Sequence, residues 1–170
     1  SGNPGERAGG TGAHGMRIGY GHAERTLSTE EVRAIVEQAS AALDRRWRRI
    51  LVLVPDGTRT MPLALLVDLL EETLGPCTDA LDYLVALGTH RPMNDEQLSR
   101  LLGRRVRSGR AGRSRVFNHD SSPESLTRVG TISAAEVGEI TGGLLNEEVP
   151  VRVNRLVYDY DLVLVCGPVF

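Results

Sequence analysis

Two uninterrupted apolar runs, at residues 50–54 and 162–166, constrain the fold of this chain more than any other feature of its sequence. Neither run approaches the ~20 residues that a membrane-spanning helix needs, so no membrane span is expected. A short apolar run without polar alternation, bounded by a residue such as Pro55 or Gly167, is typical of a strand that is buried on both faces. We therefore expect a parallel sheet.

Strand and helix patterns alternate between and around these two runs. Helical patterns cover residues 28–46, 61–74, 94–102 and 123–130. Further strand patterns cover residues 81–87 and 114–117, and a hairpin or other antiparallel excursion is expected within residues 131–154. The predicted fold class is therefore α/β, with an open, mostly parallel, Rossmann-like sheet that has helices on both faces and forms a single domain.

The basic residues exclude several functions. All 20 of them are arginine, so this chain alone cannot form a Schiff base, anchor a cofactor through lysine or build a lysine-containing phosphate loop. The net charge is only −2, so no nucleic-acid partner is expected. The arginine-rich segment at residues 104–115 has no interleaved aromatic residues for base stacking, and we expect it to be a solvated loop.

The start of the chain differs from the rest in composition. Residues 1–15 are rich in glycine and carry no large aliphatic side chain, which predicts a flexible tail in front of an α/β domain at residues 16–170. The tail lacks the pattern of a secretory signal, and two cysteines cannot make a disulfide framework. A cytoplasmic location is therefore expected.

Polar residues gather directly after three of the expected strands. They are Asp56, Gly57, Thr58 and Arg59 after the first strand, His90 and Arg91 after the second, and His119 and Asp120 after the third. The carboxyl ends of parallel strands lie along one edge of the sheet, where ligands bind in open α/β folds. An imidazole can act as a general base, a carboxylate can orient it, and arginines can clamp a carboxylate or phosphate. These residues therefore predict a proton-transferring, anion-binding site at that edge.

Other interpretations of the same loops stay open. Asp56, Gly57 and Thr58 also suit a turn that caps a helix, and either loop histidine suits a simple hydrogen-bonded role. A stand-alone phosphate- or nucleotide-binding module would use Arg59, Arg91 and helix N-termini without catalysis. A metal-dependent hydrolase would need the histidines and carboxylates of all three loops to converge. No pair of them has the i, i+4 spacing of a helical metal site, so no metal ligand is predicted.

Taken together, the loops resemble one known family. Residues 56–59 with Pro62 resemble its DxTRxxP segment, residues 86–92 its AxGTHRP segment, and residues 118–120 its NHD segment. Residues 151–155 and 161–167 resemble its vxvNr…aDlvixvG stretch. The family is that of the nickel-pincer-nucleotide-dependent lactate racemases and related 2-hydroxyacid racemases and epimerases. The resemblance covers residues 49–170 in the family's own order.

The resemblance implies a two-domain enzyme whose N-terminal domain is this chain and whose active site lies between the domains. It implies that His90 is one of two histidines that take the substrate hydroxyl proton while the α-hydrogen moves as hydride to a nickel-pincer nucleotide. Residues 56–59 would then belong to the cofactor pocket. Arg59 and Arg91 would bind the substrate, a small 2-hydroxyacid.

The resemblance also implies what lies beyond this chain. In the family, the second catalytic histidine and the cofactor-bearing lysine belong to a PHxxxGFSGGxK segment that follows the position of Phe170. We therefore expect this chain alone to be inactive and to bind no cofactor. The surface meant for the second domain would be exposed, and a homodimer could form through it.

Overall fold

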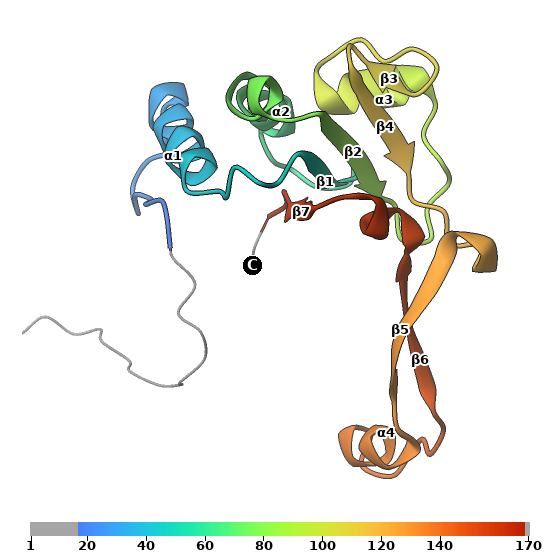
Figure 1. Ribbon diagram of the computed structural model, residues 1–170. Coiled ribbons are helices and arrows are strands. Elements are labelled where there is room, and N and C mark those ends of the chain that lie inside the picture. The colour runs from blue at the N-terminus through green and yellow to red at the C-terminus, as the bar shows by residue number, and fades with distance from the viewer. Residues whose placement is uncertain (1–16, 169–170) are drawn as a thin grey trace, which may run out of the picture.

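The computed structural model describes residues 17–168, and its centre is a five-stranded sheet in the order β3-β4-β2-β1-β7 (Figure 1). The strands are β1 (Arg49–Pro55), β2 (Ala80–Ala86), β3 (Arg110–Ala111), β4 (Ser114–Asn118) and β7 (Leu162–Val165). All neighbouring pairs are parallel except β3 with β4. The mostly parallel α/β fold is therefore confirmed. The predicted tail at residues 1–15 lies outside the described residues.

Three α-helices lie on one face of the sheet (Figure 1). They are α1 (Thr29–Ala41), α2 (Leu63–Thr73) and α3 (Asp95–Leu102), and the 3₁₀ helix η1 (Gly75–Cys77) follows α2. Alternate side chains of β1 and β2, such as Val52 and Tyr83, form the core with Val67 of α2 and Leu102 of α3, and all four are fully buried. No helix within the described residues is long and apolar enough to cross a membrane.

The opposite face of the sheet has a thinner cover. Leu51 and Leu84 point to this face and form a second apolar cluster with Tyr160. The cover comes from the 3₁₀ helix η3 (Arg155–Asp159), whose Leu156 and Val157 pack against this cluster. Among the described residues, the α-helices of the sheet thus lie on one face and a short 3₁₀ helix flanks the other.

Local sequence signals explain where the helices begin and end. Ser28 and Glu31 form a capping box at the start of α1, and Asn94 and Gln97 do the same for α3. Gly103 ends α3 in the left-handed conformation, with φ of 66°. Each of these caps involves residues that are close in the sequence, so the sequence pattern alone predicts them.

The backbone at Gly103 also lies close to helix α2. Gly103→Ala should therefore lower the free energy of unfolding by about 2–4 kcal/mol. A Cβ at this position would lie 2.5 Å from Cβ of Ala64 in α2, and its backbone would remain in the left-handed region. Gly112→Ala is the matched control, because Gly112 has φ of 62° but open space around it. Urea unfolding of both variants separates the two effects. Equal losses would show that the contact with Ala64 costs nothing.

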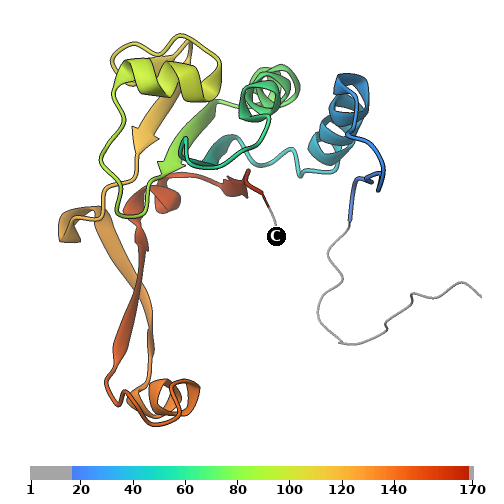
Figure 2. The same cartoon turned by 180° about the vertical axis from the view of Figure 1, so that it is seen from behind.

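A two-stranded arm projects away from the main sheet (Figures 1 and 2). It consists of β5 (Leu126–Ile132) and β6 (Val149–Asn154), which pair antiparallel, and it carries α4 (Ala134–Ile140) at its tip. The antiparallel excursion is therefore confirmed. The helix predicted at residues 123–130 is wrong, because the chain forms only the 3₁₀ turn η2 (Pro123–Ser125) before it enters β5.

Two other expectations need correction. Helix α1 ends at Ala41 rather than near Arg46, because Asp44 accepts the backbone N–H of Arg46 (2.9 Å) and starts a local turn in place of further helical bonds. The segment at residues 104–115 is not simply a solvated loop. It contains β3, and Val106 and Ala111 are buried in the core.

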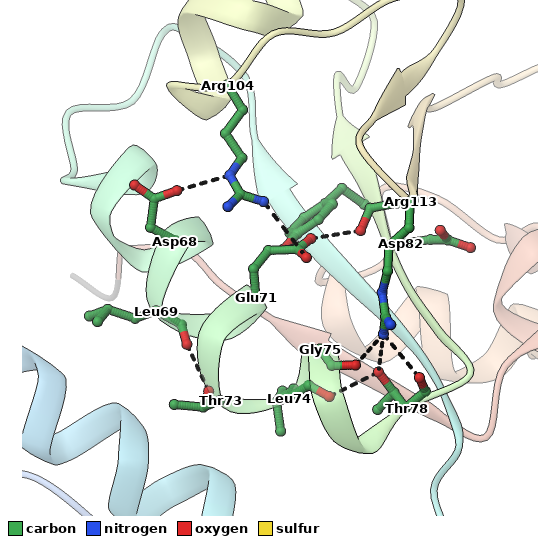
Figure 3. Close-up of polar contacts among 12 residues, drawn as sticks. Asp68, Leu69, Glu71, Thr73, Leu74, Gly75, Thr78, Asp82, Arg104 and Arg113 are labelled. Carbon is green, nitrogen blue, oxygen red and sulfur yellow. Dashed lines mark hydrogen bonds and ion pairs between the residues drawn. The ribbon is translucent and has the colours of Figure 1, made fainter.

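The arginines of that segment hold the sheet against α2 (Figure 3). Arg104 donates to Asp68 (2.9 Å), and Arg113 donates to the carbonyls of Gly75 and Thr78. Nearby, Glu71 of α2 accepts the hydroxyls of Tyr83 (3.0 Å) and Ser114 (2.6 Å). Burial and the Glu71 carboxylate both raise the pKa of Tyr83, so its hydroxyl stays protonated and keeps donating. These contacts fasten α2 to β2 and to the β3–β4 hairpin.

Candidate functional site

The loops after β1 and β2 meet because the two strands are parallel neighbours in register, with Pro55 beside Ala86. Asp56 leaves β1 and His90 lies in the loop after β2, 34 residues further along the chain. Nδ1 of His90 lies 2.5 Å from Oδ2 of Asp56. The parallel sheet thus joins the carboxylate and the imidazole that the sequence placed in separate loops.

Asp56 is held as an ionised carboxylate. Its Oδ1 accepts the hydroxyl (2.5 Å) and the backbone N–H (3.1 Å) of Thr58. These bonds, chiefly the one from the Thr58 hydroxyl and next the one from His90, lower the pKa of Asp56 to about 2. The side chain of Asp56 is 11% exposed, whereas that of His90 is 59% exposed. A fixed inner carboxylate therefore supports an outer imidazole that a ligand can reach.

The carboxylate also fixes the orientation of the His90 ring. An ionised carboxylate only accepts hydrogen bonds, so Nδ1 of His90 must carry the proton that it donates to Asp56. In the neutral ring, Nε2 is then left with a free lone pair. His90 therefore presents a basic nitrogen, backed by a carboxylate that stabilises the imidazolium formed when it takes a proton.

Arg59 and His90 border the same open hollow. This hollow has a volume of about 470 Å³ and lies between the loops after β1 and β2 and the end of β7. No hydrogen bond or ion pair engages the Arg59 side chain among the described residues, so its guanidinium can receive an anion. Gly57 and Gly88 leave open space where a Cβ would be, so a ligand can approach the backbone there.

The loop after β4 adds His119 to this region. Asn118 fixes the loop after β2, because its side-chain amide accepts the backbone N–H of Met93 and donates to the Met93 carbonyl, both at 2.9 Å. His119 and His90 line one further hollow of about 340 Å³. Nδ1 of His119 lies 3.1 Å from Nδ2 of Asn154, at the end of the arm.

Asp120 and Arg91 take no part in these contacts. Asp120 accepts hydrogen bonds from Ser122 and Ser125, chiefly the Ser122 backbone N–H, and these lower its pKa. Asp120 thus organises its own turn, although it borders the same hollow as His119. Arg91 is exposed, and among residues 17–168 no ion pair engages it. The substrate-binding role of Arg91 stays a prediction.

The loops do not form a metal centre by themselves. Within residues 17–168, no group of three or more His, Cys, Asp and Glu side chains is placed to hold a metal ion. Asp56 and His90 bind each other, whereas Asp120 is engaged with serines. The convergence that a metal-dependent hydrolase requires is therefore missing from the described part of the chain.

Sequence reasoning missed the roles of Asn118 and Asn154. Both asparagines fall in segments that carry a motif, but their partners, Met93 and His119, lie 25 and 35 residues away. The sequence offers one signal for each: Asn118 directly precedes a histidine, and Asn154 follows a stretch of alternating apolar residues. Neither signal identifies a partner.

Comparison with known proteins assigns the chain to a family. Residues 23–170 match the family model described as "Lactate racemase N-terminal domain". A crystal structure of a protein from Thermotoga maritima is similar, with a TM-score of 0.72 and 32% sequence identity over 82% of this chain. This chain spans only 33% of that relative. A search of curated proteins finds no significant match. The chain therefore belongs to the family of lactate racemase N-terminal domains.

Proposed function

We propose that this chain is the N-terminal domain of a 2-hydroxyacid racemase or epimerase, and that His90 is its proton-transferring group. The observation that carries the proposal is the Asp56–His90 pair, which lies at the carboxyl edge of the sheet beside Arg59. A site that binds a 2-hydroxycarboxylate and removes its hydroxyl proton needs a base, a carboxylate that orients the base, and a guanidinium that is free to bind the substrate carboxylate. Membership of the lactate racemase family supports the same reaction class.

The proposed roles follow from the chemistry of each side chain. Arg59 binds the substrate carboxylate and places the C2 hydroxyl near His90. In one direction of the reaction Nε2 of His90 takes the hydroxyl proton while Asp56 stabilises the imidazolium, and in the reverse direction His90 returns it. The second histidine of the family serves the other face of the substrate. When bound, the nickel-pincer nucleotide of this family would supply the hydride acceptor that inversion at C2 requires.

The residues of this chain fit one part of that cofactor. The open backbone at Gly57 and Gly88, which leaves room for a close approach, suits the phosphate of a mononucleotide beside the site that Arg59 offers to the substrate. The nickel ion and a covalent attachment are not accommodated, since the described residues hold no metal cluster and the chain contains no lysine. In this proposal those groups bind elsewhere in the active protein, and this chain alone does not turn over substrate.

The test is racemisation by the protein at its natural length, produced together with the machinery that makes the cofactor. A panel of D-2-hydroxyacids is assayed, and bound nickel is measured alongside. Inversion of one substrate by a nickel-containing protein is the expected result. A protein that binds no nickel and inverts nothing contradicts the proposal and favours the alternative, a phosphate- or nucleotide-binding module.

Arg59→Ala should raise KM for the inverted substrate by about tenfold or more, because the ligand carboxylate loses a charge-assisted hydrogen bond. Arg46→Ala is the matched control, since Arg46 is exposed and its side chain binds only Asp44 among residues 17–168. Steady-state kinetics of the two variants check the placement. An unchanged KM in Arg59→Ala would show that Arg59 does not bind the substrate.

A further inference from the structure

The orientation of the Asn154 side chain is fixed by its two partners. Oδ1 of Asn154 lies 3.0 Å from the backbone nitrogen of Leu156, and Nδ2 lies 3.1 Å from Nδ1 of His119. A backbone N–H can only donate, so the atom that faces Leu156 must be the amide oxygen. The amide nitrogen of Asn154 therefore faces His119, and a reversed amide would place two donors against each other.

This orientation determines the tautomer of His119. The amide nitrogen of Asn154 only donates, so Nδ1 of His119 must accept and cannot carry a proton. In the neutral ring the proton is then on Nε2. No other polar side chain competes for Nδ1 among the described residues, because the neighbouring carboxylate, Asp120, is engaged with Ser122 and Ser125.

The two histidines that line one hollow are thus held in opposite tautomers. Asp56 fixes the proton of His90 on Nδ1 and leaves Nε2 as an acceptor. Asn154 leaves His119 with a proton on Nε2 and no free acceptor on the ring. Both rings border the same volume of about 340 Å³. One ring can accept a proton from a ligand, and the other can donate a hydrogen bond to it.

We propose that His119 is a ligand-binding residue whose Nε2–H donates a hydrogen bond to a carboxylate oxygen of the substrate, and that Asn154 is the positioning residue that fixes this tautomer. The identity of the ligand rests on the proposed function, whereas the tautomer does not. The arrangement assigns different tasks to the two histidines. His90 exchanges a proton with the hydroxyl, and His119 holds the carboxylate beside it.

Nitrogen-15 NMR of the natural-length protein labelled on histidine tests the tautomer directly. At a pH where both rings are neutral, His119 should show a pyrrole-type signal at Nε2 and a pyridine-type signal at Nδ1, and His90 the reverse. Asn154→Asp should switch His119 to the Nδ1–H form, because a carboxylate accepts where the amide donated, and it keeps the bond to Leu156. A wild-type Nδ1–H ring, or a tautomer that Asn154→Asp leaves unchanged, overturns the assignment.

Ligand binding is tested on the same labelled protein and by kinetics. D-lactate should shift the His119 Nε2 signal, and propane-1,2-diol, which lacks the carboxylate, should not. His119→Leu should raise KM for the inverted 2-hydroxyacid by about tenfold or more with a smaller change in kcat, and His119→Gln, which restores an N–H donor, should recover part of the loss. A His119→Leu variant with unchanged KM overturns the ligand-binding role.

Failure of the proposed function is distinguishable from failure of this inference. A protein that inverts no 2-hydroxyacid contradicts the racemase activity, but the NMR signals of His119 still decide whether Asn154 fixes the ring. Racemisation that proceeds normally with the Nδ1–H tautomer at His119 leaves the proposed function standing and contradicts this inference, both the positioning role of Asn154 and the Nε2–H donor of His119.

Discussion

Replacement of His90 by alanine should lower kcat of the natural-length enzyme by a factor of about 10²–10⁴, because no other group near the Asp56 carboxylate can take its place as a base. Within the described residues, Asp56 forms side-chain hydrogen bonds only with Thr58 of its own loop and with His90 of the loop after β2. The side chain of His90 is 59% exposed, so its removal leaves no large cavity and the fold should persist. Racemisation rates and circular dichroism of the variant check both statements.

Two further variants define the result. His22→Ala is the matched control, because His22 is an exposed histidine that contacts Arg25 and Glu31 and lines neither hollow beside His90, and it should leave kcat unchanged. Asp56→Asn should lower kcat less than His90→Ala does, since it keeps the base and removes the charge that stabilises the imidazolium. Wild-type turnover by His90→Ala would eliminate His90 as the proton-transferring group.

Replacement of Asp82 by alanine should lower the free energy of unfolding by about 3 kcal/mol. Asp82 is almost fully buried in β2, on the face opposite the α-helices. It accepts the backbone and side-chain N–H groups of Arg115 (2.6 and 2.9 Å) and the hydroxyl of Tyr160 (2.7 Å). Alanine would leave the guanidinium of Arg115 and the hydroxyl of Tyr160 without the carboxylate that accepts their hydrogen bonds. The cost of keeping these donors partly buried without that acceptor accounts for most of the lost stability.

Asp79→Ala is the matched control for this prediction. Asp79 also pairs with an arginine, Arg48, but both side chains are more than half exposed, so its loss should cost less than about 1 kcal/mol. A triple variant with Asp82→Leu, Arg115→Met and Tyr160→Phe should recover part of the stability, because it removes the unpaired partners as well. Denaturant unfolding followed by circular dichroism measures all three. Equal losses for Asp82→Ala and Asp79→Ala would contradict the argument from burial.

The elements that the sequence predicts well are those whose cause is local. Strand β1 is an apolar run bounded by Arg49 and Pro55, and helix α3 is capped by Asn94 at its start and by Gly103 at its end. The carboxyl-edge location of the site follows from the parallel fold, so the pairing of Asp56 with His90 could also be anticipated. Neighbouring residues contain the information for β1 and α3, whereas the Asp56–His90 pair also requires the rule that parallel strands end at one edge of the sheet.

The features that the sequence does not predict depend on distant partners. Residues after Pro123 have a helix-start signal, yet residues 126–132 form a strand because β6 is available to pair with them. The sequence pattern suggests that the arginines of residues 104–115 are solvated, yet Arg113 donates to the carbonyls of Gly75 in η1 and of Thr78. The tautomer of His119 depends on Asn154, 35 residues away. Tertiary contacts override local preference at all three places.

The pairing of β1 with β7 has a consequence for how the chain folds during synthesis. Arg49 and Asp161, at the start of the two strands, are 112 residues apart in the sequence. A ribosome that adds 5–20 residues per second leaves this side of β1 without its neighbour for on the order of 10 seconds. An apolar strand with a free edge is a template for pairing with other chains. Aggregation of the nascent protein should therefore depend strongly on how fast residues 56–161, between the two strands, are translated.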